Sequence, residues 1–189
     1  MKKIIIASAL SAAITLPMSA IAADYKVDTK GAHASVNFKV SHLGYSYIEG
    51  RFNTFEGQFS YDADAIEASK VNISVDTTSL DSNHAERDKH LRGDDFIDAS
   101  QFSTATFVST KVDKKADGGL AITGDMTLHG VTKSIVVDAN FIGEGKDPWG
   151  GYRAGFEGKT RLQVADFGIK EIGASTYVDL TIQLEGIRQ

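Results

Sequence analysis

The sequence contains no cysteine, two prolines and one tryptophan among its 189 residues. Without cysteine, neither a disulfide framework nor a lipid anchor on a modified cysteine is available. Two prolines and the lack of a serine- or glycine-rich linker argue against a second domain. Basic residues are also few: 20 Lys and Arg stand against 25 Asp and Glu, which gives a formal net charge of −5. Nucleic acid is therefore not an expected partner.

The first residues are typical of a secretory signal peptide. Two lysines precede an apolar run over residues 4–16, and Ala20-Ile21-Ala22 supplies a cleavage site of small residues. The apolar run is too short for a membrane span and is broken by Pro17. We expect cleavage after Ala22 to release a single exported domain, residues 23–189, into the periplasm.

Most of the remaining chain alternates between apolar and polar side chains, as half-buried strands do. In the second predicted strand the apolar positions change from even to odd, which indicates a bulge near Asn53 or Thr54. Alternation does not define the inward face around Phe107. The eight stretches expected to form strands are residues 34–42, 47–61, 70–76, 103–112, 120–128, 131–141, 152–164 and 177–185.

Eight long strands with one apolar face each favour an all-β fold in which the sheet closes as an antiparallel barrel. The turn between the fifth and sixth strands is expected at His129-Gly130. A sandwich is the alternative, although its strands are usually shorter. An outer-membrane barrel shows the same alternation, but the chain ends in Gly186-Ile187-Arg188-Gln189 and has no paired aromatic belts.

One stretch, residues 76–96, interrupts the strand pattern. Asp81 and Ser82 are good N-caps, and the residues after them favour helix. We therefore predict one short helix over about residues 83–92. Helical spacing also predicts two ion pairs, between Asp88 and Arg92 and between Glu86 and a protonated His90.

Residues that could do chemistry form no recognisable catalytic or metal-binding pattern. His84 and His90 lie on different sides of the predicted helix, and neither an H-E-x-x-H nor a G-x-S-x-G motif occurs. Ser41 and His42 are neighbours in a strand and so face opposite sides. We predict no catalytic residue, no metal site and no cofactor.

The inward apolar faces either fill the barrel as a packed core or line a space for one ligand. A lining with few polar groups predicts a long apolar guest. The expected ligand-binding lining consists of Val36, Phe38, Val40, Phe52, Phe59, Val71, Ile73, Met126, Leu128, Ile135, Val137, Phe156, Leu162, Leu180 and Ile182.

Several longer motifs are specific to one family. They are residues 24–28 (DYKVD) with His33, residues 42–45 (HLGY), 83–91 (NHAERDKHL), 124–133 (GDMTLHGVTK), 147–151 (DPWGG) with 153–156 (RAGF), and 166–169 (DFGI). Through these motifs the mature chain resembles, from end to end, the YceI-like family of periplasmic proteins, also called the polyisoprenoid-binding family. It departs from the family where Ser134 replaces a usual proline and Phe102-Ser103 replaces a usual Tyr-Pro.

The resemblance implies an extended, lipocalin-like eight-stranded antiparallel barrel whose interior holds a long isoprenoid or other amphiphilic chain, with no catalytic residues established for the family. We therefore expect a periplasmic binding or carrier protein for an isoprenoid lipid, such as a polyprenyl or quinone-like lipid. Its expected contacts with a membrane are transient, and it is expected to be a monomer or a homodimer. Two alternatives stay open: an enzyme that acts on such a lipid through His84, Arg87 and Asp88, and a stress-related structural protein with a packed core.

Overall fold

The computed structural model describes residues 22–173 and 175–189, so the predicted signal peptide, except for Ala22, lies outside the described residues. No helix in these two ranges is long and apolar enough to cross a membrane. The strands are β1 (Ala23–Val27), β2 (Ser35–His42), β3 (Ser46–Phe52), β4 (Phe55–Tyr61), β5 (Lys70–Asp76), β6 (Leu80–Asp81), β7 (Thr104–Lys114), β8 (Leu120–Leu128), β9 (Val131–Lys146), β10 (Tyr152–Gln163) and β11 (Tyr177–Arg188). The helices are α1 (Ala85–Leu91) and three 3₁₀ turns, η1 (Ile66–Ala68), η2 (Thr77–Ser79) and η3 (Val164–Phe167).

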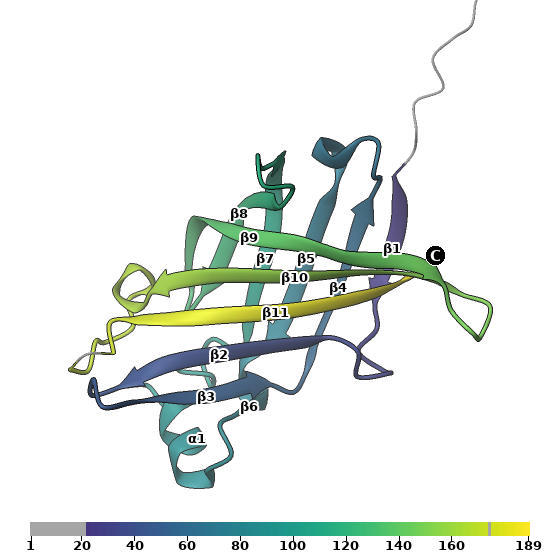
Figure 1. The fold of residues 1–189 in the computed structure, drawn as a ribbon. Helices are drawn as coiled ribbons and strands as arrows, with labels where there is room; N and C mark the ends of the chain where they lie inside the picture. Colours follow the sequence, from purple (N-terminus) through teal and green to yellow (C-terminus); the bar gives the residue numbers. More distant parts are fainter. Residues whose placement is uncertain (1–21, 174) are drawn as a thin grey trace, which may run out of the picture.

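The sheet closes on itself because β1 pairs with both β4 and β11. Antiparallel pairing runs in the order β1-β4-β5-β7-β8-β9-β10-β11 and returns to β1, which makes a ring of eight strands. In Figure 1 the long strands β9, β10 and β11 cross in front of β4, β5 and β7. The prediction of a closed eight-stranded antiparallel barrel with one short helix is confirmed.

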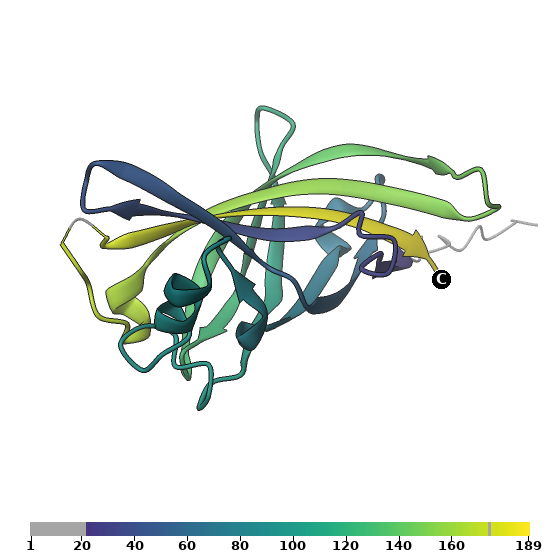
Figure 2. The same ribbon diagram turned by 90° about the horizontal axis from the view of Figure 1, so that it is seen from below.

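The ring is complete at one end and spread apart at the other. β2 continues along the edge of β11 where β1 stops, and β3 pairs with β2 as β4 pairs with β1. On its other side β3 pairs with the two-residue strand β6, whereas β4 pairs with β5. Figure 2 shows the β2–β3 pair leaving the ring above α1. The strand predicted over residues 47–61 is thus two strands that serve different parts of the sheet.

The change of inward positions between Phe52 and Phe55 comes from this break, so the predicted bulge is wrong. Asn53 donates its backbone N–H to the Ser79 carbonyl over 3.1 Å, and Thr54 donates to Ser79 Oγ over 3.0 Å. These bonds hold a corner of the chain against the η2 turn. A bulge does occur further on, between Ser109 and Lys111 of β7.

Other boundaries differ at the chain ends and turns. Residues 23–27 form β1, where no strand was predicted, and β9 continues to Lys146, beyond the strand predicted over residues 131–141. The hairpin expected at His129-Gly130 is confirmed: both residues have positive φ, 51° and 73°, as a two-residue type I′ turn requires.

Helix α1 is capped differently from the prediction. His84 is the N-cap, and its Nδ1 accepts the Arg87 backbone N–H over 3.2 Å. The predicted Asp88–Arg92 pair does not form, because Arg92 Nη1 donates to the Leu80 carbonyl over 2.7 Å. His90 Nε2 lies 3.9 Å from Asp95 Oδ2 and not against Glu86, so the predicted pair between Glu86 and His90 is also wrong.

Asp88 anchors α1 to the chain before it. Its buried carboxylate accepts the Ser82 backbone N–H over 2.8 Å and also the Ser82 hydroxyl. Arg87 completes the contact: its Nε donates to Ser82 Oγ over 2.7 Å, and its Nη2 donates to the Ser82 carbonyl over 2.5 Å. The two charged side chains therefore hold the segment in place.

Replacing Asp88 tests this anchoring role. Asp88→Ala leaves the buried Ser82 N–H without an acceptor and should lower the free energy of unfolding by about 1 to 3 kcal/mol. Asp88→Asn keeps an accepting oxygen, so its free energy of unfolding, measured with urea, should fall less than that of Asp88→Ala. Equal losses in the two variants would contradict the anchoring role.

Candidate functional site

An apolar cavity of about 130 Å³ lies between the inner faces of the barrel strands. Alternate residues of β5, β7, β8, β9, β10 and β11 project into it, because successive side chains of a strand face opposite sides of the sheet. Ten of the fifteen predicted lining residues border the cavity: Val36, Phe59, Val71, Ile73, Met126, Ile135, Val137, Phe156, Leu180 and Ile182. Their part in ligand binding stays a prediction.

The other five predicted residues face inward or pack nearby but do not border the cavity. Leu162 is 2% exposed and packs with Phe167 and Ile169 in a second cluster beneath η3. Leu128 contacts both this cluster and the main core. These residues close one end of the barrel and do not line its hollow.

Phe38, Val40 and Phe52 belong to the part of the sheet that leaves the ring. The Phe38 and Phe52 rings pack at 5.8 Å, and a side chain at Gly50 would collide with Phe38. Val40 pairs with Ile48 and Val178 near the outer end of the β2–β3 pair. Alternation identified their face correctly but not their distance from the cavity.

Some cavity-lining residues were absent from the prediction. Val75, Leu120, Ile122, Ala139 and Leu184 border the cavity, and each lies at even spacing from a predicted residue of its own strand. Strand parity could have found them. Phe107 and Val112 could not be found in this way, because the β7 bulge between them reverses the inward positions.

A cluster of aromatic rings forms one wall. The Phe156 ring lies 5.5 Å from Phe59, 5.1 Å from Tyr61 and 5.4 Å from Phe141, and Tyr25 stacks on Phe59 at 4.9 Å. Edge-to-face and offset-stacked contacts are the arrangements that aromatic rings prefer. The inward position expected for Phe156 is confirmed, since this residue borders the cavity.

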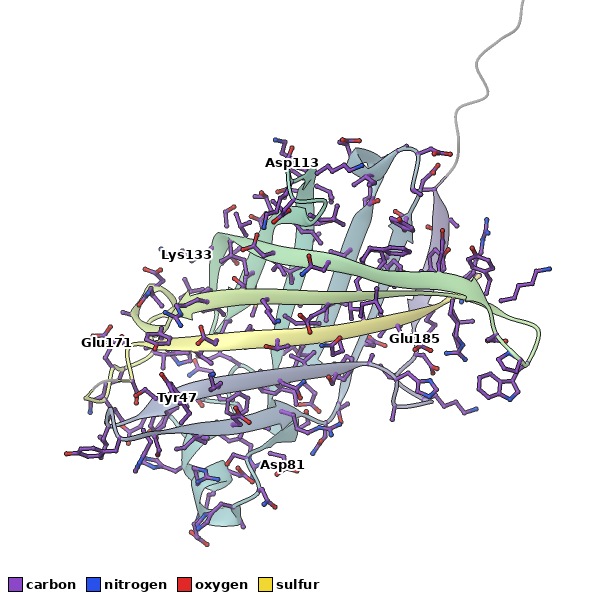
Figure 3. The ribbon with its side chains drawn as sticks, in the orientation of Figure 1. Tyr47, Asp81, Asp113, Lys133, Glu171 and Glu185 are labelled. Carbon is purple, nitrogen blue, oxygen red and sulfur yellow. The ribbon has the colours of Figure 1, made fainter. Side chains whose placement is uncertain are left out.

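A network of charged groups ties the connections at one end of the barrel. Arg153 Nη1 donates to Asp28 Oδ2 over 2.7 Å and to Glu185 Oε1 over 2.6 Å, while Nε donates to Asp147 Oδ2 over 2.8 Å. His33 Nδ1 lies 2.9 Å from Asp28 Oδ2. Figure 3 shows Glu185 near the end of the sheet where β9 and β10 are joined. The network links the β1–β2 and β9–β10 connections to β11.

Arg153 changes the acidity of its partners. Its hydrogen bond to Asp28 is the main cause that lowers the pKa of that buried carboxyl to about 2, and the Gly31 backbone N–H adds to it. The Arg153 hydrogen bond also lowers the pKa of Asp147, and the carboxylates raise the pKa of Arg153. Because a guanidinium already binds both Asp28 and Glu185, the arrangement fits an ion-pair network better than a metal site.

The His84, Arg87 and Asp88 group of the enzyme alternative lies apart from the cavity. The Arg87 and Asp88 side chains bind Ser82, the His84 ring caps α1, and none of the three borders the cavity. None of these three side chains is therefore placed to contact a molecule held in the cavity.

Asp28→Asn should show the stability that the network supplies. A carboxyl whose pKa is lowered on folding stabilises the protein above its unfolded pKa of about 4, and this contribution disappears as the pH falls toward 2. We expect the free energy of unfolding of the variant to be about 2 to 3 kcal/mol lower than that of the parent at pH 7. The difference should shrink progressively between pH 4 and pH 2, as measured by urea unfolding.

The exposed Asp113, paired with Lys111, provides the control. Asp113→Asn should change the free energy of unfolding by less than about 1 kcal/mol at pH 7. A pH-independent difference between the parent and Asp28→Asn would show that the Asp28 charge does not stabilise the fold.

Comparisons with known proteins agree with this architecture. A model of the YceI-like domain matches residues 25–186. A UPF0312 protein of Vibrio vulnificus strain YJ016 is 64% identical over 189 residues, which cover 100% of both chains. The crystal structure of a Campylobacter jejuni YCEI protein matches with a TM-score of 0.71 at 28% identity, over 80% of this chain and 91% of that one.

A polyisoprenoid binding domain from Saccharophagus degradans, implicated in plant cell wall breakdown, has the same fold. Its TM-score is 0.64 at 17% identity, over 89% of this chain and 100% of that one. The family model covers most of the sequence, and the Vibrio relative covers all of it. The chain therefore belongs to the YceI-like family.

Proposed function

We propose that the protein is a periplasmic binding or carrier protein for an isoprenoid lipid, polyprenyl or quinone-like, or for another long-chain amphiphile held inside the barrel. The apolar cavity inside the barrel carries this proposal. The description of the Saccharophagus degradans neighbour as a polyisoprenoid binding domain supports it. Transient membrane contact and a monomeric or homodimeric state remain predictions.

The size of the cavity indicates how such a guest would enter. A dry apolar cavity of about 150 Å³ accepts benzene, and pockets for larger ligands usually measure about 300 to 1,000 Å³. At about 130 Å³, the cavity holds one small apolar group without rearrangement. A long chain must therefore displace side chains, and the aromatic wall of Phe59, Tyr61 and Phe156 is where large side chains border the space.

Burial of the chain supplies enough free energy for this rearrangement. Each CH₂ group removed from water contributes about 0.8 kcal/mol, so a few isoprene units suffice for tight binding without polar contacts. We propose a binding protein and not an enzyme, since the described residues that line the cavity are mainly apolar and include no histidine, aspartate or glutamate. The selectivity of such a site rests mainly on the length and shape of the apolar chain.

Ligand occupancy is the direct test. Protein isolated from the periplasm of the producing cell should contain a lipid that organic extraction and mass spectrometry detect at about one molecule per chain. The control is a protein of similar size taken through the same purification. Protein that is repeatedly free of lipid, and that takes up no added isoprenoid, would favour the alternative of a packed structural core.

Phe156→Ala tests whether the aromatic wall adjusts to a guest. Removing a buried ring from a filled core costs about 3 to 5 kcal/mol. A guest that shifts into the vacated space offsets part of this, so urea unfolding should show a smaller loss with lipid bound than after delipidation. Phe156→Asp should weaken lipid binding further, because an unpaired carboxylate is costly in an apolar lining.

Val136→Ala is the matched control, because Val136 is 51% exposed on the neighbouring strand β9. It should leave lipid binding unchanged. If both Phe156 variants stayed folded and bound lipid as the parent does, Phe156 would not form part of the binding site.

A further inference from the structure

Three tyrosines continue the inner face of the barrel beyond one end of the cavity. Tyr61 of β4 borders the cavity itself, and Tyr25 of β1 faces inward because its ring stacks on Phe59. On β10, Tyr152 has the same parity as the inward-facing Phe156. The three rings therefore lie on the wall between the cavity and the end of the barrel where β1 closes the sheet, beside the C-terminus in Figure 1.

Charged side chains share this face with the tyrosines. The Arg188 guanidinium of β11 lies 5.6 Å from the centre of the Tyr152 ring. In the register of β9 and β10, Glu144 lies opposite Ala154, and Lys146 lies opposite Tyr152. Residues opposite each other in an antiparallel pair point to the same face of the sheet, so Glu144 and Lys146 also face inward. This end of the barrel thus combines hydroxyl groups with charges of both signs.

Two of the tyrosine hydroxyls are unpaired but not sealed from their surroundings. Tyr25 and Tyr61 are only 2% and 8% exposed, and within the described chain their hydroxyls make no hydrogen bond. Among the described residues, Ser69 Oγ is the one fully buried side-chain oxygen or nitrogen without a partner, so neither tyrosine oxygen is fully buried. Because the cavity lining is almost wholly apolar, Tyr61 turns its ring to the cavity and its hydroxyl beyond it. Buried hydroxyls are usually paired, so a bound molecule would satisfy these two.

The electrostatic surroundings of the two hydroxyls disfavour a negative charge. Burial is the main cause that raises the pKa of Tyr25 and of Tyr61, and the Glu144 carboxylate is the next. Arg188 lowers the pKa of Tyr25, but by less than Glu144 raises it, and Asp62 raises the pKa of Tyr61 further. A phosphate beside these hydroxyls would meet the same surroundings that disfavour a tyrosine oxyanion. Both hydroxyls therefore stay protonated and can donate to an uncharged acceptor.

We propose, on the basis of the proposed lipid-binding function, that Tyr25 and Tyr61 form a subsite for an uncharged head group that offers a hydroxyl or carbonyl oxygen. Each tyrosine hydroxyl donates a hydrogen bond to that head group. This assigns an orientation to the ligand: its polar end lies where β1 closes the sheet. Its apolar tail points toward the cluster of Leu162, Phe167 and Ile169 at the other end of the barrel.

Three probes that share a C20 isoprenoid chain test the proposal: geranylgeraniol, geranylgeranyl diphosphate and the hydrocarbon without a head group. The delipidated protein is equilibrated with equal amounts of two probes in non-ionic detergent micelles, and the bound lipids are extracted and quantified by mass spectrometry. The double variant Tyr25→Phe, Tyr61→Phe removes only the two hydroxyls. One hydrogen bond corresponds to about a tenfold change in affinity, so the ratio of bound alcohol to bound hydrocarbon should fall at least about tenfold.

Glu144→Gln tests the electrostatic part of the proposal. It removes the negative charge near the two hydroxyls, so the ratio of bound diphosphate to bound alcohol should rise about threefold or more relative to the parent. Tyr45→Phe is the matched control for the loss of a tyrosine hydroxyl. Tyr45 is 88% exposed in the turn between β2 and β3, at the opposite end of β11 from Arg188, and its replacement should leave both ratios unchanged.

The outcomes distinguish the two proposals. If the double variant binds the alcohol and the hydrocarbon in the same ratio as the parent, the role of Tyr25 and Tyr61 is wrong and the lipid-binding function stands. The same conclusion follows if the parent binds the diphosphate in preference to the alcohol, or if Glu144→Gln does not raise the share of the diphosphate. If none of the three probes binds the parent, the lipid-binding function itself is wrong.

Discussion

Closure of the sheet is the constraint on which the rest of the structure depends. A strand at an open edge leaves a row of backbone N–H and C=O groups unpaired, and a barrel removes that edge. Here β1 supplies the missing partner for both β4 and β11 over a few residue pairs. Once these pairs form, the apolar faces of the long strands turn toward one another and away from water, so burial of the interior follows from closure of the ring.

The shape and polarity of the interior then depend on the residues at its two ends and on its wall. The cluster around Phe167 fills one end, and aromatic rings narrow the space on one side. The ion pairs of Arg153 hold the connections outside the hollow, where they do not add charge to its lining. An apolar hollow of this kind discriminates between guests mainly through their size and shape.

Much of the fold was predictable because strand periodicity is a local property. Alternation of two residues correctly placed Val71, Ile73 and Phe156 on the inner face, since parity depends only on immediate neighbours. It could not give the height of a residue along the barrel. Leu162 and Phe38 therefore have the expected face but lie outside the cavity lining. The bulge in β7 could not be predicted either, because one extra residue reverses which positions face inward without any recognisable sequence signal.

Contacts between distant parts of the chain were beyond such reasoning. Asp28 and Arg153 are 125 residues apart, and no sequence pattern around either residue identifies the other as its partner. In the helical interruption, intrinsic preferences predicted the helix, but competing bonds to Ser82 and Leu80 replaced the expected pair between Asp88 and Arg92. Local pattern therefore predicted the walls of the site, whereas its ends, corners and polar contacts depend on tertiary structure.

The seam between β1 and β11 also sets the order in which the chain can fold. It pairs Tyr25 with Arg188, so the first strand of the ring must wait for the last. A chain that emerges from its amino end can form the hairpins of the middle early, but the barrel stays open until synthesis is complete. Such a delay would suit the export that we propose, because a chain whose barrel is still open can be threaded through a narrow channel.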